Sequence, residues 1–247
     1  MLQMIEVSKI YRNTGKEDLI ALNDLNITIE KGEFVCVVGV SGCGKTTVLR
    51  LIAGLDFPTE GKILMDGRAI DGPGWERCVV FQKYTLFPWR TVSDNVAFPL
   101  EIQKVDRRER RMIREKYIHL VGLGDFTGAY PSQLSGGMQQ RVAVARALAA
   151  NPKILLMDEP FGALDSRTRE GLQNELVRIW QCEPKTVLFV THSIGEAITL
   201  ADRVVVMTGR PGRVRSDIAI ELPRPRDKQA EPFREYYARI HRLLDET

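Results

Sequence analysis

The residues best suited to chemistry stand together in one loop, Gly39-Val40-Ser41-Gly42-Cys43-Gly44-Lys45-Thr46-Thr47. Their spacing fits G-x-x-x-x-G-K-[ST], a pattern that wraps a phosphate chain when it joins a strand to a helix. The apolar residues 34–38 predict a buried parallel strand before the loop. Residues 47–53 have helical spacing and stop at Gly54, which favours a helix end. The sequence therefore predicts a nucleotide-binding loop rather than a glycine-rich turn with an incidental lysine.

Each part of this loop has a physical role toward a phosphate anion. Gly39, Gly42 and Gly44 permit backbone angles and a close approach that a Cβ would block. The loop amides would point at the anion, reinforced by the positive end of the following helix. We expect Lys45 to reach the β- and γ-phosphates and the Thr46 hydroxyl to ligate Mg²⁺.

Two carboxylates end a later apolar run, Ile154-Leu155-Leu156-Met157-Asp158-Glu159. In an enzyme with a phosphate loop, the first acid at such a strand end supports Mg²⁺, and the second can polarise the attacking water. The structural alternative is a pair of acids that only caps a strand before Pro160. The phosphate loop upstream in the same chain favours the catalytic interpretation.

Gln82 and His192 each follow a predicted strand. The carboxyl ends of strands in an open α/β sheet are where ligands bind. We therefore expect His192 to contact the γ-phosphate region and Gln82 to take a Mg²⁺-ligand or water position. The alternatives are a structural histidine and a turn glutamine.

A second candidate anion site lies in Leu134-Ser135-Gly136-Gly137-Met138-Gln139-Gln140-Arg141. Ser135 can cap the helix predicted from Gly137 to Ala150, and free helix amides follow the two glycines. Two phosphate-binding helix ends far apart in one sequence suggest a nucleotide that is shared between two chains.

The surrounding elements set the fold class. Strands at 154–157, 186–190 and 204–207 alternate with helices at 167–181 and 193–201, which predicts a mostly parallel sheet covered on both faces. Alternating strands are predicted at 3–11 and 25–30, and a hairpin arm at 62–65, with a further buried strand at 78–81. Residues 83–150 contain no convincing strand, but residues 107–121 predict a basic amphipathic helix. Its charged face is expected to be solvated and partly paired with Asp106, Glu109 and Glu115, and a binding patch is the alternative. Residues 213–222 suit a peripheral strand, and residues 232–245 a docked terminal helix.

Composition excludes several classes of protein. The chain has 247 residues, is 44% hydrophobic and carries a net charge of +3, which is too mild to argue for nucleic-acid binding. It has no apolar run long enough to span a bilayer, and its first residues lack the pattern of a signal peptide. The 4 cysteines are scattered, which favours a reduced, cytoplasmic protein. We expect the Cys43 thiol to be unusually reactive, because it lies beside the loop amides and a helix start.

Together these residues resemble the ATP-binding cassette (ABC) family over nearly the whole chain. Gly39 to Thr46 matches its Walker A motif, Ile154 to Glu159 its Walker B motif, and Leu134 to Arg141 its signature. Shorter matches are Gln82 for the Q-loop, Ala163-Leu164-Asp165 for the D-loop, His192 for the H-loop and Tyr11 for the adenine-stacking aromatic. The chain departs from the family at Met138, where glutamine is commonest, and at Gly162, where serine is commoner.

The resemblance implies an α/β fold: a P-loop NTPase core of the ABC type with a mostly parallel sheet, an N-terminal antiparallel β subdomain and an inserted α-helical subdomain. Residues 1–247 would form a single ABC ATPase domain. Within it, residues 1–82 and 151–222 would be the nucleotide-binding core, 83–150 the helical subdomain with the signature, and 223–247 a C-terminal extension.

The resemblance also implies an ATP hydrolase that uses ATP and Mg²⁺ and works as a head-to-tail dimer. Its expected catalytic residues are Glu159, His192 and Gln82, and its expected metal ligands are Thr46, Gln82 and Asp158. The residues expected to bind ATP are Tyr11, Gly39, Ser41, Gly42, Cys43, Gly44, Lys45, Thr46, Thr47 and Asp158. The second copy would contribute Ser135, Gly136, Gly137 and Gln139, and Asp165 would belong to the D-loop.

The segment from Phe81 to Val92 and the Pro211-Gly212-Arg213-Val214 turn are similar to the nitrate/sulfonate/taurine importer branch. That similarity implies a membrane permease as partner, an external solute-binding protein as indirect partner, and a place on the cytoplasmic side of the inner membrane. Phe87, Pro88 and Trp89 are candidates for the permease groove, with core packing as the alternative. An exporter ATPase subunit and a soluble ABC ATPase that acts on DNA or ribosomes are the other functions considered.

Overall fold

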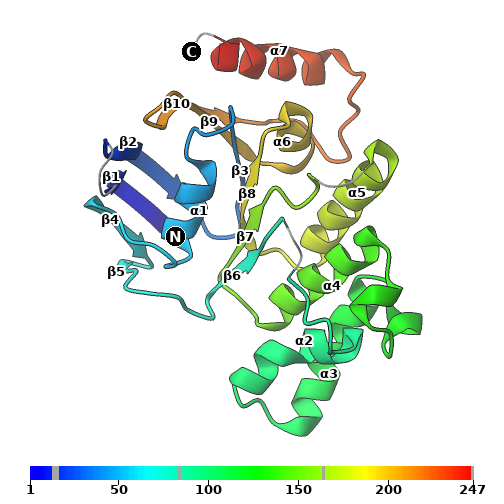
Figure 1. Cartoon of the computed structure of the whole chain (residues 1–247). Coiled ribbons are helices and arrows are strands. Elements are labelled where there is room, and N and C mark those ends of the chain that lie inside the picture. The colour runs from blue at the N-terminus through cyan, green and yellow to red at the C-terminus, as the bar shows by residue number, and fades with distance from the viewer. Residues whose placement is uncertain (13–16, 83–84, 163–164, 246–247) are drawn as a thin grey trace. The chain divides into compact units, whose positions relative to one another are not determined.

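The computed structural model describes residues 1–12, 17–82, 85–162 and 165–245. The chain forms two compact units, residues 1–74 with 185–247 and residues 75–184. Figure 1 labels the helices and strands of both. Within the described ranges, no helix combines the length and the apolar character needed to cross a bilayer.

An antiparallel sheet with strand order β2-β1-β4-β5 begins the first unit. Its strands are β1 (Leu2–Tyr11), β2 (Leu19–Ile29), β4 (Glu60–Met65) and β5 (Arg68–Ala69). Asp66 and Gly67 both have positive φ, as a tight hairpin turn between β4 and β5 requires. This sheet confirms the predicted N-terminal antiparallel subdomain and its hairpin.

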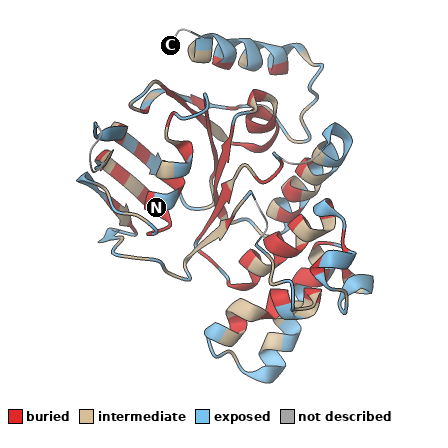
Figure 2. Ribbon diagram, in the orientation of Figure 1, coloured by how far each residue is buried: buried red, intermediate tan, exposed pale blue. Residues whose placement is uncertain are grey.

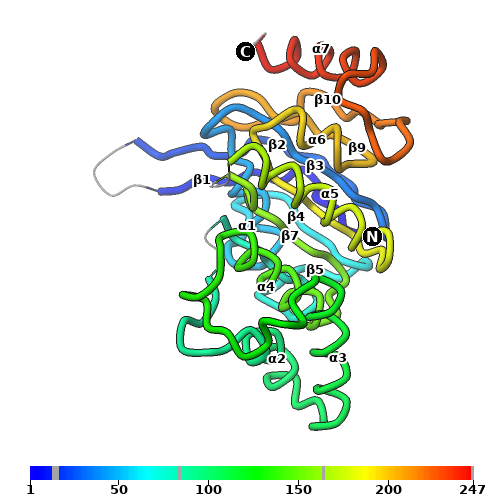
Figure 3. The backbone as a smooth tube through the Cα atoms, turned by 90° about the vertical axis from the view of Figure 1, so that its right-hand side faces the viewer, coloured from blue at the N-terminus to red at the C-terminus, as the bar shows by residue number. Residues whose placement is uncertain are grey.

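Strand β2 begins at Leu19, well before the predicted start at residue 25. The alternation is clear from Leu25 to Ile29, but earlier the pairing of β1 with β2 shifts register, and Asp24 has a φ of 52°. Leu19 and Ile20 are 57% and 45% exposed, so these apolar residues do not define a buried face of the strand. The early part of the strand therefore lacks the alternation of apolar and polar residues from which a strand is predicted. The two strands lie side by side in Figure 3.

The second sheet contributes four strands to this unit, in the order β10-β9-β3-β8. They are β3 (Phe34–Gly39), β8 (Thr186–Thr191), β9 (Arg203–Thr208) and β10 (Arg213–Ala219). Strand β3 pairs in parallel with β8 and β9, and β10 is antiparallel to β9. Every residue of β3 and β8 is buried, as Figure 2 shows in red. Continuous apolar runs thus form the predicted parallel core.

The described residues of the first unit form the helices α1 (Lys45–Ile52), α6 (Ile194–Leu200) and α7 (Glu231–Asp245). Helices α1 and α6 contact β3 and β8, while α7 packs on α6 and β9, as Figures 1 and 3 show. The predicted docking of α7 is confirmed, but with fewer anchors. Only Phe233 and Ile240 are buried in it, and Tyr237 is 43% exposed.

The second unit contains the parallel pair β6 (Arg77–Val80) and β7 (Ile154–Asp158) and most of the helices. The α-helices are α2 (Val92–Ile102), α3 (Arg107–Leu120), α4 (Gly136–Ala149) and α5 (Ser166–Cys182). Short 3₁₀ turns lie at Gly124–Phe126 and Pro131–Gln133. Strand β6 is less buried than predicted, with Val80 alone fully buried in it. Helix α2 was not predicted individually, because Pro99 lies inside it.

Candidate functional site

The predicted phosphate loop lies in the first unit between β3 and α1. Gly42 and Gly44 have φ values of 82° and 91°, in the region that side chains disfavour. A Cβ on Gly39 would lie 2.5 Å from the Met207 carbonyl oxygen and 2.6 Å from Cys43 Sγ. Glycine is therefore required at Gly42 and Gly44 by the backbone conformation and at Gly39 by the crowding around it.

Lys45 is the first residue of α1, and its side chain folds over the loop. Its Nζ donates hydrogen bonds to the carbonyl oxygens of Gly39 at 2.8 Å and Val40 at 3.0 Å. The residue is only 6% exposed, and in the described part of the chain no carboxylate forms an ion pair with it. A buried ammonium without a counter-charge is costly, so this position favours a bound anion. Beside it, Thr46 is exposed and Thr47 half-buried.

Arg210, in the turn after β9, is a loop contact that the sequence did not reveal. Its Nη2 donates a hydrogen bond of 3.2 Å to the Ser41 carbonyl oxygen, and a Cβ on Gly42 would lie 2.3 Å from the same nitrogen. Gly212 from the same turn also touches the loop, since its Cβ would lie 2.0 Å from the Cys43 carbonyl oxygen. The Pro211-Gly212 pair after the last core strand was the only sequence feature that pointed to a turn here, and it did not indicate a contact with the phosphate loop.

The Cys43 side chain is fully buried behind the loop. Burial raises the pKa of its thiol above the ordinary value, and this outweighs the opposite effect of the Lys45 charge. The expectation of an unusually reactive thiol is therefore wrong, because the sulfur points away from solvent and the thiolate is disfavoured.

Tyr11, the predicted adenine-stacking residue, lies at the end of β1. Its hydroxyl donates a hydrogen bond of 2.8 Å to Asp56 Oδ2, and Lys9 Nζ lies 2.6 Å from Asp56 Oδ1. Burial, followed by this bond to Asp56, raises the pKa of Tyr11. Asp56 was not singled out in the sequence, where it is one acid in the turn after the first helix.

His192 directly follows β8, and its side chain is exposed. The backbone around it is held by a buried pair, in which the Thr191 hydroxyl donates to Glu196 Oε2 at 2.6 Å. The amide of Ser193 donates to Thr191 Oγ1 at 3.0 Å, and Ser193 in turn caps α6. Glu196, only 6% exposed, is a further supporting residue that no sequence pattern indicated.

The second unit brings Gln82, Glu159 and Gly162 together. The Gly162 amide donates to the Glu159 carbonyl oxygen at 3.0 Å, and a Cβ on Gly162 would lie 3.1 Å from Gln82 Nε2. Gly162, which stands where the family more commonly has serine, thus leaves room for the Gln82 side chain. Asp158 ends β7, and Glu159 has a φ of 44°, a strained value typical of functional positions.

The candidate signature begins helix α4 of the second unit. Ser135 caps the helix by accepting a hydrogen bond of 3.3 Å from the Met138 amide, and both Ser135 and Gly136 are exposed. Gly137 is buried, and its Cβ would lie 3.3 Å from Leu172 of α5. Gln139 Nε2 donates to the carbonyl oxygens of Pro131 and Leu134 at 2.9 and 3.2 Å, so its amide fixes the preceding loop.

Asp165 caps helix α5, where its carboxylate accepts a hydrogen bond of 3.0 Å from the Thr168 amide. Hydrogen bonds from the Thr168 side chain and then its backbone lower the pKa of this exposed carboxyl. The rest of the predicted D-loop, Ala163-Leu164, lies outside the described residues, as do Lys83 and Tyr84 after Gln82.

Comparison with known proteins identifies the family. Residues 22–162 match the family model described as ABC transporter. The uncharacterised ABC transporter ATP-binding protein MJ0412 of Methanocaldococcus jannaschii is 56% identical over 243 residues, which cover 98% of this chain and 91% of that protein. The nitrate import ATP-binding protein NrtD of Synechocystis sp. is 50% identical over 223 residues, which cover 90% of this chain and 83% of that protein.

A solved structure agrees with these sequences. It is described as a dimeric, post-hydrolysis state of the ATP-binding cassette MJ0796 bound to ADP and Pi. It shares 36% identity with this chain at a TM-score of 0.77, covering 90% of this chain and all of that one. The chain therefore belongs to the ABC transporter family of ATP-hydrolysing subunits. The expected resemblance to the branch that contains nitrate importers, and the expected fold class, are confirmed.

Proposed function

We propose that this ABC ATPase powers the uptake of a small anion, such as nitrate, sulfonate or taurine, through a separate membrane permease. The observation that carries the proposal is the 50% identity to a nitrate import ATP-binding protein over 90% of this chain. The protein would then act as a peripheral subunit on the cytoplasmic face of the membrane. An exporter subunit or a soluble ABC ATPase remains the alternative for the experiment to exclude.

We assign the catalytic steps residue by residue, as the family resemblance implies. Lys45 and the loop amides from Gly39 to Thr47 hold the phosphates, and Tyr11 stacks on adenine. Glu159 polarises the attacking water, and His192 contacts the γ-phosphate. Lys45 is buried and forms no ion pair with a carboxylate among the described residues, and this supports its role, because a phosphate would supply the missing negative charge.

Thr46, Gln82 and Asp158 would hold Mg²⁺, which neutralises charge on the β- and γ-phosphates when it is bound. Their hydroxyl, amide carbonyl and carboxylate oxygens fit this ion, since Mg²⁺ prefers oxygen ligands and keeps several waters. The described residues contain no cluster of three or more His, Cys, Asp or Glu side chains that could hold a metal. A site completed by substrate phosphates needs no such cluster.

We propose that two copies close head to tail on ATP, with Ser135, Gly136 and Gly137 of each copy capping the nucleotide of the other. The exposure of Ser135 and Gly136 at the start of α4 supports this role, and so does the dimeric state described for the related cassette. Gln139 contributes by holding the loop before the signature in shape. We also propose that residues 1–82 and 151–222 form the nucleotide-binding core, residues 83–150 the helical part and residues 223–247 a C-terminal extension.

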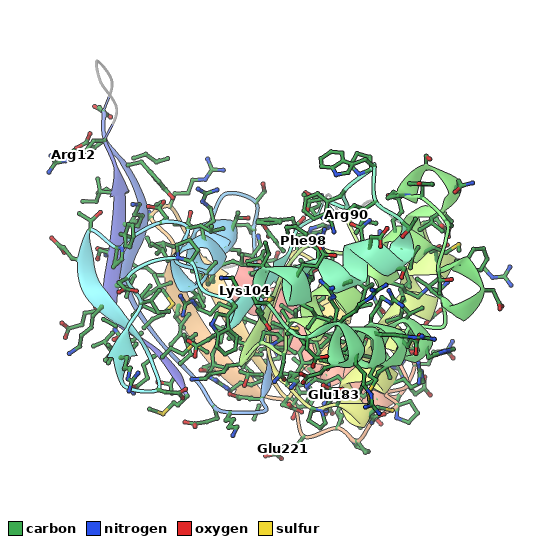
Figure 4. The ribbon with its side chains drawn as sticks, turned by 90° about the horizontal axis from the view of Figure 1, so that it is seen from below. Arg12, Arg90, Phe98, Lys104, Glu183 and Glu221 are labelled. Atoms are coloured by element: carbon green, nitrogen blue, oxygen red, sulfur yellow. The ribbon has the colours of Figure 1, made fainter. Side chains whose placement is uncertain are left out.

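The segment after Gln82 offers a surface for the permease. Trp89 is 72% exposed, and its ring lies 5.7 Å from that of Phe87. The Arg90 guanidinium carbon lies over the Phe98 ring, 5.0 Å from its centroid. Both residues are labelled in Figure 4. Buried Asn95 fixes this segment, because its Nδ2 donates to the carbonyl oxygens of Phe87, Arg90 and Thr91 at 3.0–3.2 Å. An exposed aromatic residue on a rigid segment suits protein docking.

The proposal is tested by reconstitution with a candidate permease and a candidate solute-binding protein from the same genome. Vesicles with ATP and this subunit on the outer face and the binding protein inside should move labelled nitrate, sulfonate or taurine outward, the direction that corresponds to uptake. Lys45→Ala is the matched inactive control. Transport in the opposite direction would make the chain an exporter subunit, and failure to bind any permease would favour a soluble ATPase.

A further inference from the structure

A cavity of about 400 Å³ lies in the second unit against helices α2 and α3. Helix α2 lines it with Asp94, Ala97 and Glu101, and helix α3 lines it with Arg107, Arg110, Arg111 and Arg114. These residues recur at three, four and seven positions, so each helix turns one face to the cavity. That spacing normally carries apolar packing residues, but here α3 places arginines on it.

Each of the two acids of the cavity is bonded to a residue outside it, but among the described residues only Glu101 is paired with a cation, so Asp94 keeps one negative charge against the four arginines. The Asp94 carboxylate accepts a hydrogen bond of 2.7 Å from the Thr91 hydroxyl. Glu101 Oε2 lies 2.9 Å from Arg90 Nη1 in an ion pair. Neither Thr91 nor Arg90 lines the cavity, so these carboxylates are held from outside it.

The arginines exceed the carboxylates that are available to them. Arg111 and Arg114 share Glu115, at 2.8 Å and 3.8 Å. Arg107 and Arg110 form no ion pair with any described residue. Both lie near the start of α3, where the helix dipole disfavours cations. No ion pair with a described residue therefore balances the charge of Arg107 and Arg110, and an anion between the helices would balance it.

We propose that this cavity binds a multivalent oxyanion of the phosphate class. Guanidinium groups pair with phosphate oxygens in a bidentate manner, and two unpaired arginines match a charge of at least two. The volume suits a diphosphate or a phosphorylated small molecule. None of the lining residues is among those assigned to ATP, so this ligand would be held by a different set of residues. Its ligand is either a soluble phosphate compound or a phospholipid headgroup, and the experiment separates these sources.

The first arm is calorimetric titration with pyrophosphate of full-length protein saturated with ADP, so that the phosphate loop is already occupied. The double variant Arg107→Gln/Arg110→Gln should weaken binding about tenfold or more, the scale of losing charge-assisted contacts. Arg107→Gln alone is matched by Arg108→Gln, which removes the same charge from the next residue of the same helix turn but does not line the cavity. The control should change affinity less than about twofold. Basal ATP hydrolysis should be unchanged in all these variants, which also verifies folding.

The second arm measures sedimentation with vesicles of phosphatidylglycerol, compared with vesicles of phosphatidylcholine. Pyrophosphate binding that depends on Arg107 and Arg110 identifies a soluble ligand, and binding to anionic vesicles alone with the same dependence identifies a headgroup. The proposal is overturned if the wild-type protein binds neither probe, or if the double variant and Arg108→Gln behave alike.

Discussion

The Tyr11 hydroxyl donates a hydrogen bond of 2.8 Å to Asp56 Oδ2, and this bond joins the end of strand β1 to the turn after helix α1. Lys9 completes the arrangement, with Nζ at 2.6 Å from Asp56 Oδ1 and 4.9 Å from the Tyr11 ring centroid. Asp56 and Lys9 are mostly buried, at 19% and 12% exposure of their side chains. Burial opposes ionisation of Asp56, but the hydrogen bonds from Lys9 and Tyr11 lower its pKa. Asp56 is thus a positioning residue for the proposed adenine platform.

Asp56→Ala should raise the KM for ATP about tenfold with little change in kcat, because a ring without its anchor stacks less well on adenine. Stability should fall by about 2 kcal/mol, as for loss of a hydrogen bond to a charged group. Steady-state kinetics and thermal unfolding measure the two effects. Tyr11→Phe, which keeps the ring but removes the hydroxyl, should show a smaller rise in KM. If Asp56→Ala lowered the stability but left the KM for ATP unchanged, Asp56 would have only a structural role.

Glu159→Gln should slow ATP hydrolysis by roughly 10²–10⁴-fold, the usual scale for losing a positioned base. Nucleotide binding should persist, because the phosphate loop is untouched, and the ATP-bound dimer should accumulate. A phosphate-release assay and size-exclusion chromatography check these outcomes, with Glu170→Gln, at an exposed position of α5, as control. Hydrolysis at the wild-type rate would remove Glu159 from the mechanism.

Ser135→Arg should prevent ATP-dependent dimer formation while the monomer still binds ATP. The arginine would fill the position assigned to the second copy's nucleotide, and the cap of α4 would also be lost at a cost of about 1 kcal/mol. Ser132→Arg, at an exposed serine in the preceding turn, is the matched control and should still dimerise. Light scattering with and without ATP distinguishes them. Dimerisation of Ser135→Arg at the wild-type level would contradict the shared site.

Alkylation should reach Cys182 well before Cys43, because Cys182 is exposed and Cys43 is buried. Since burial raises the pKa of Cys43, the reactive thiolate forms there only at higher pH, and its labelling rate should keep rising above the pH where an ordinary thiol levels off. Peptide mass spectrometry after timed iodoacetamide treatment follows both sites. Equal labelling of the two at neutral pH would show that the loop opens readily.

Much of the fold was predictable, because each strand of the parallel core is a continuous apolar run and the glycine loop has strict steric requirements. Residues 34–38, 186–190 and 204–207 gave their strands directly, and Gly42 and Gly44 have the positive φ that the loop pattern implies. The amphipathic helix predicted at residues 107–121 is observed as α3. Local sequence determines these features.

The supporting contacts were not predictable, because they join residues far apart in the chain. Arg210 reaches Ser41 across 169 positions, and Asp56 reaches Tyr11 across 45. The direction of the Cys43 side chain also depended on tertiary packing, since the loop pattern fixes the backbone but not the side on which the sulfur lies. Glu196, a buried acid, resembled an ordinary helix residue until its bond to Thr191 was seen.

The bonds from Asn95 have a mechanical consequence. One buried amide on helix α2 ties down three carbonyl groups and the Phe87 amide, so residues 87–91 and the start of α2 form a stiff piece. If a neighbouring protein displaced Trp89, residues 87–91 and helix α2 would therefore move together as a rigid body. Little of the motion would be lost to bending of the segment.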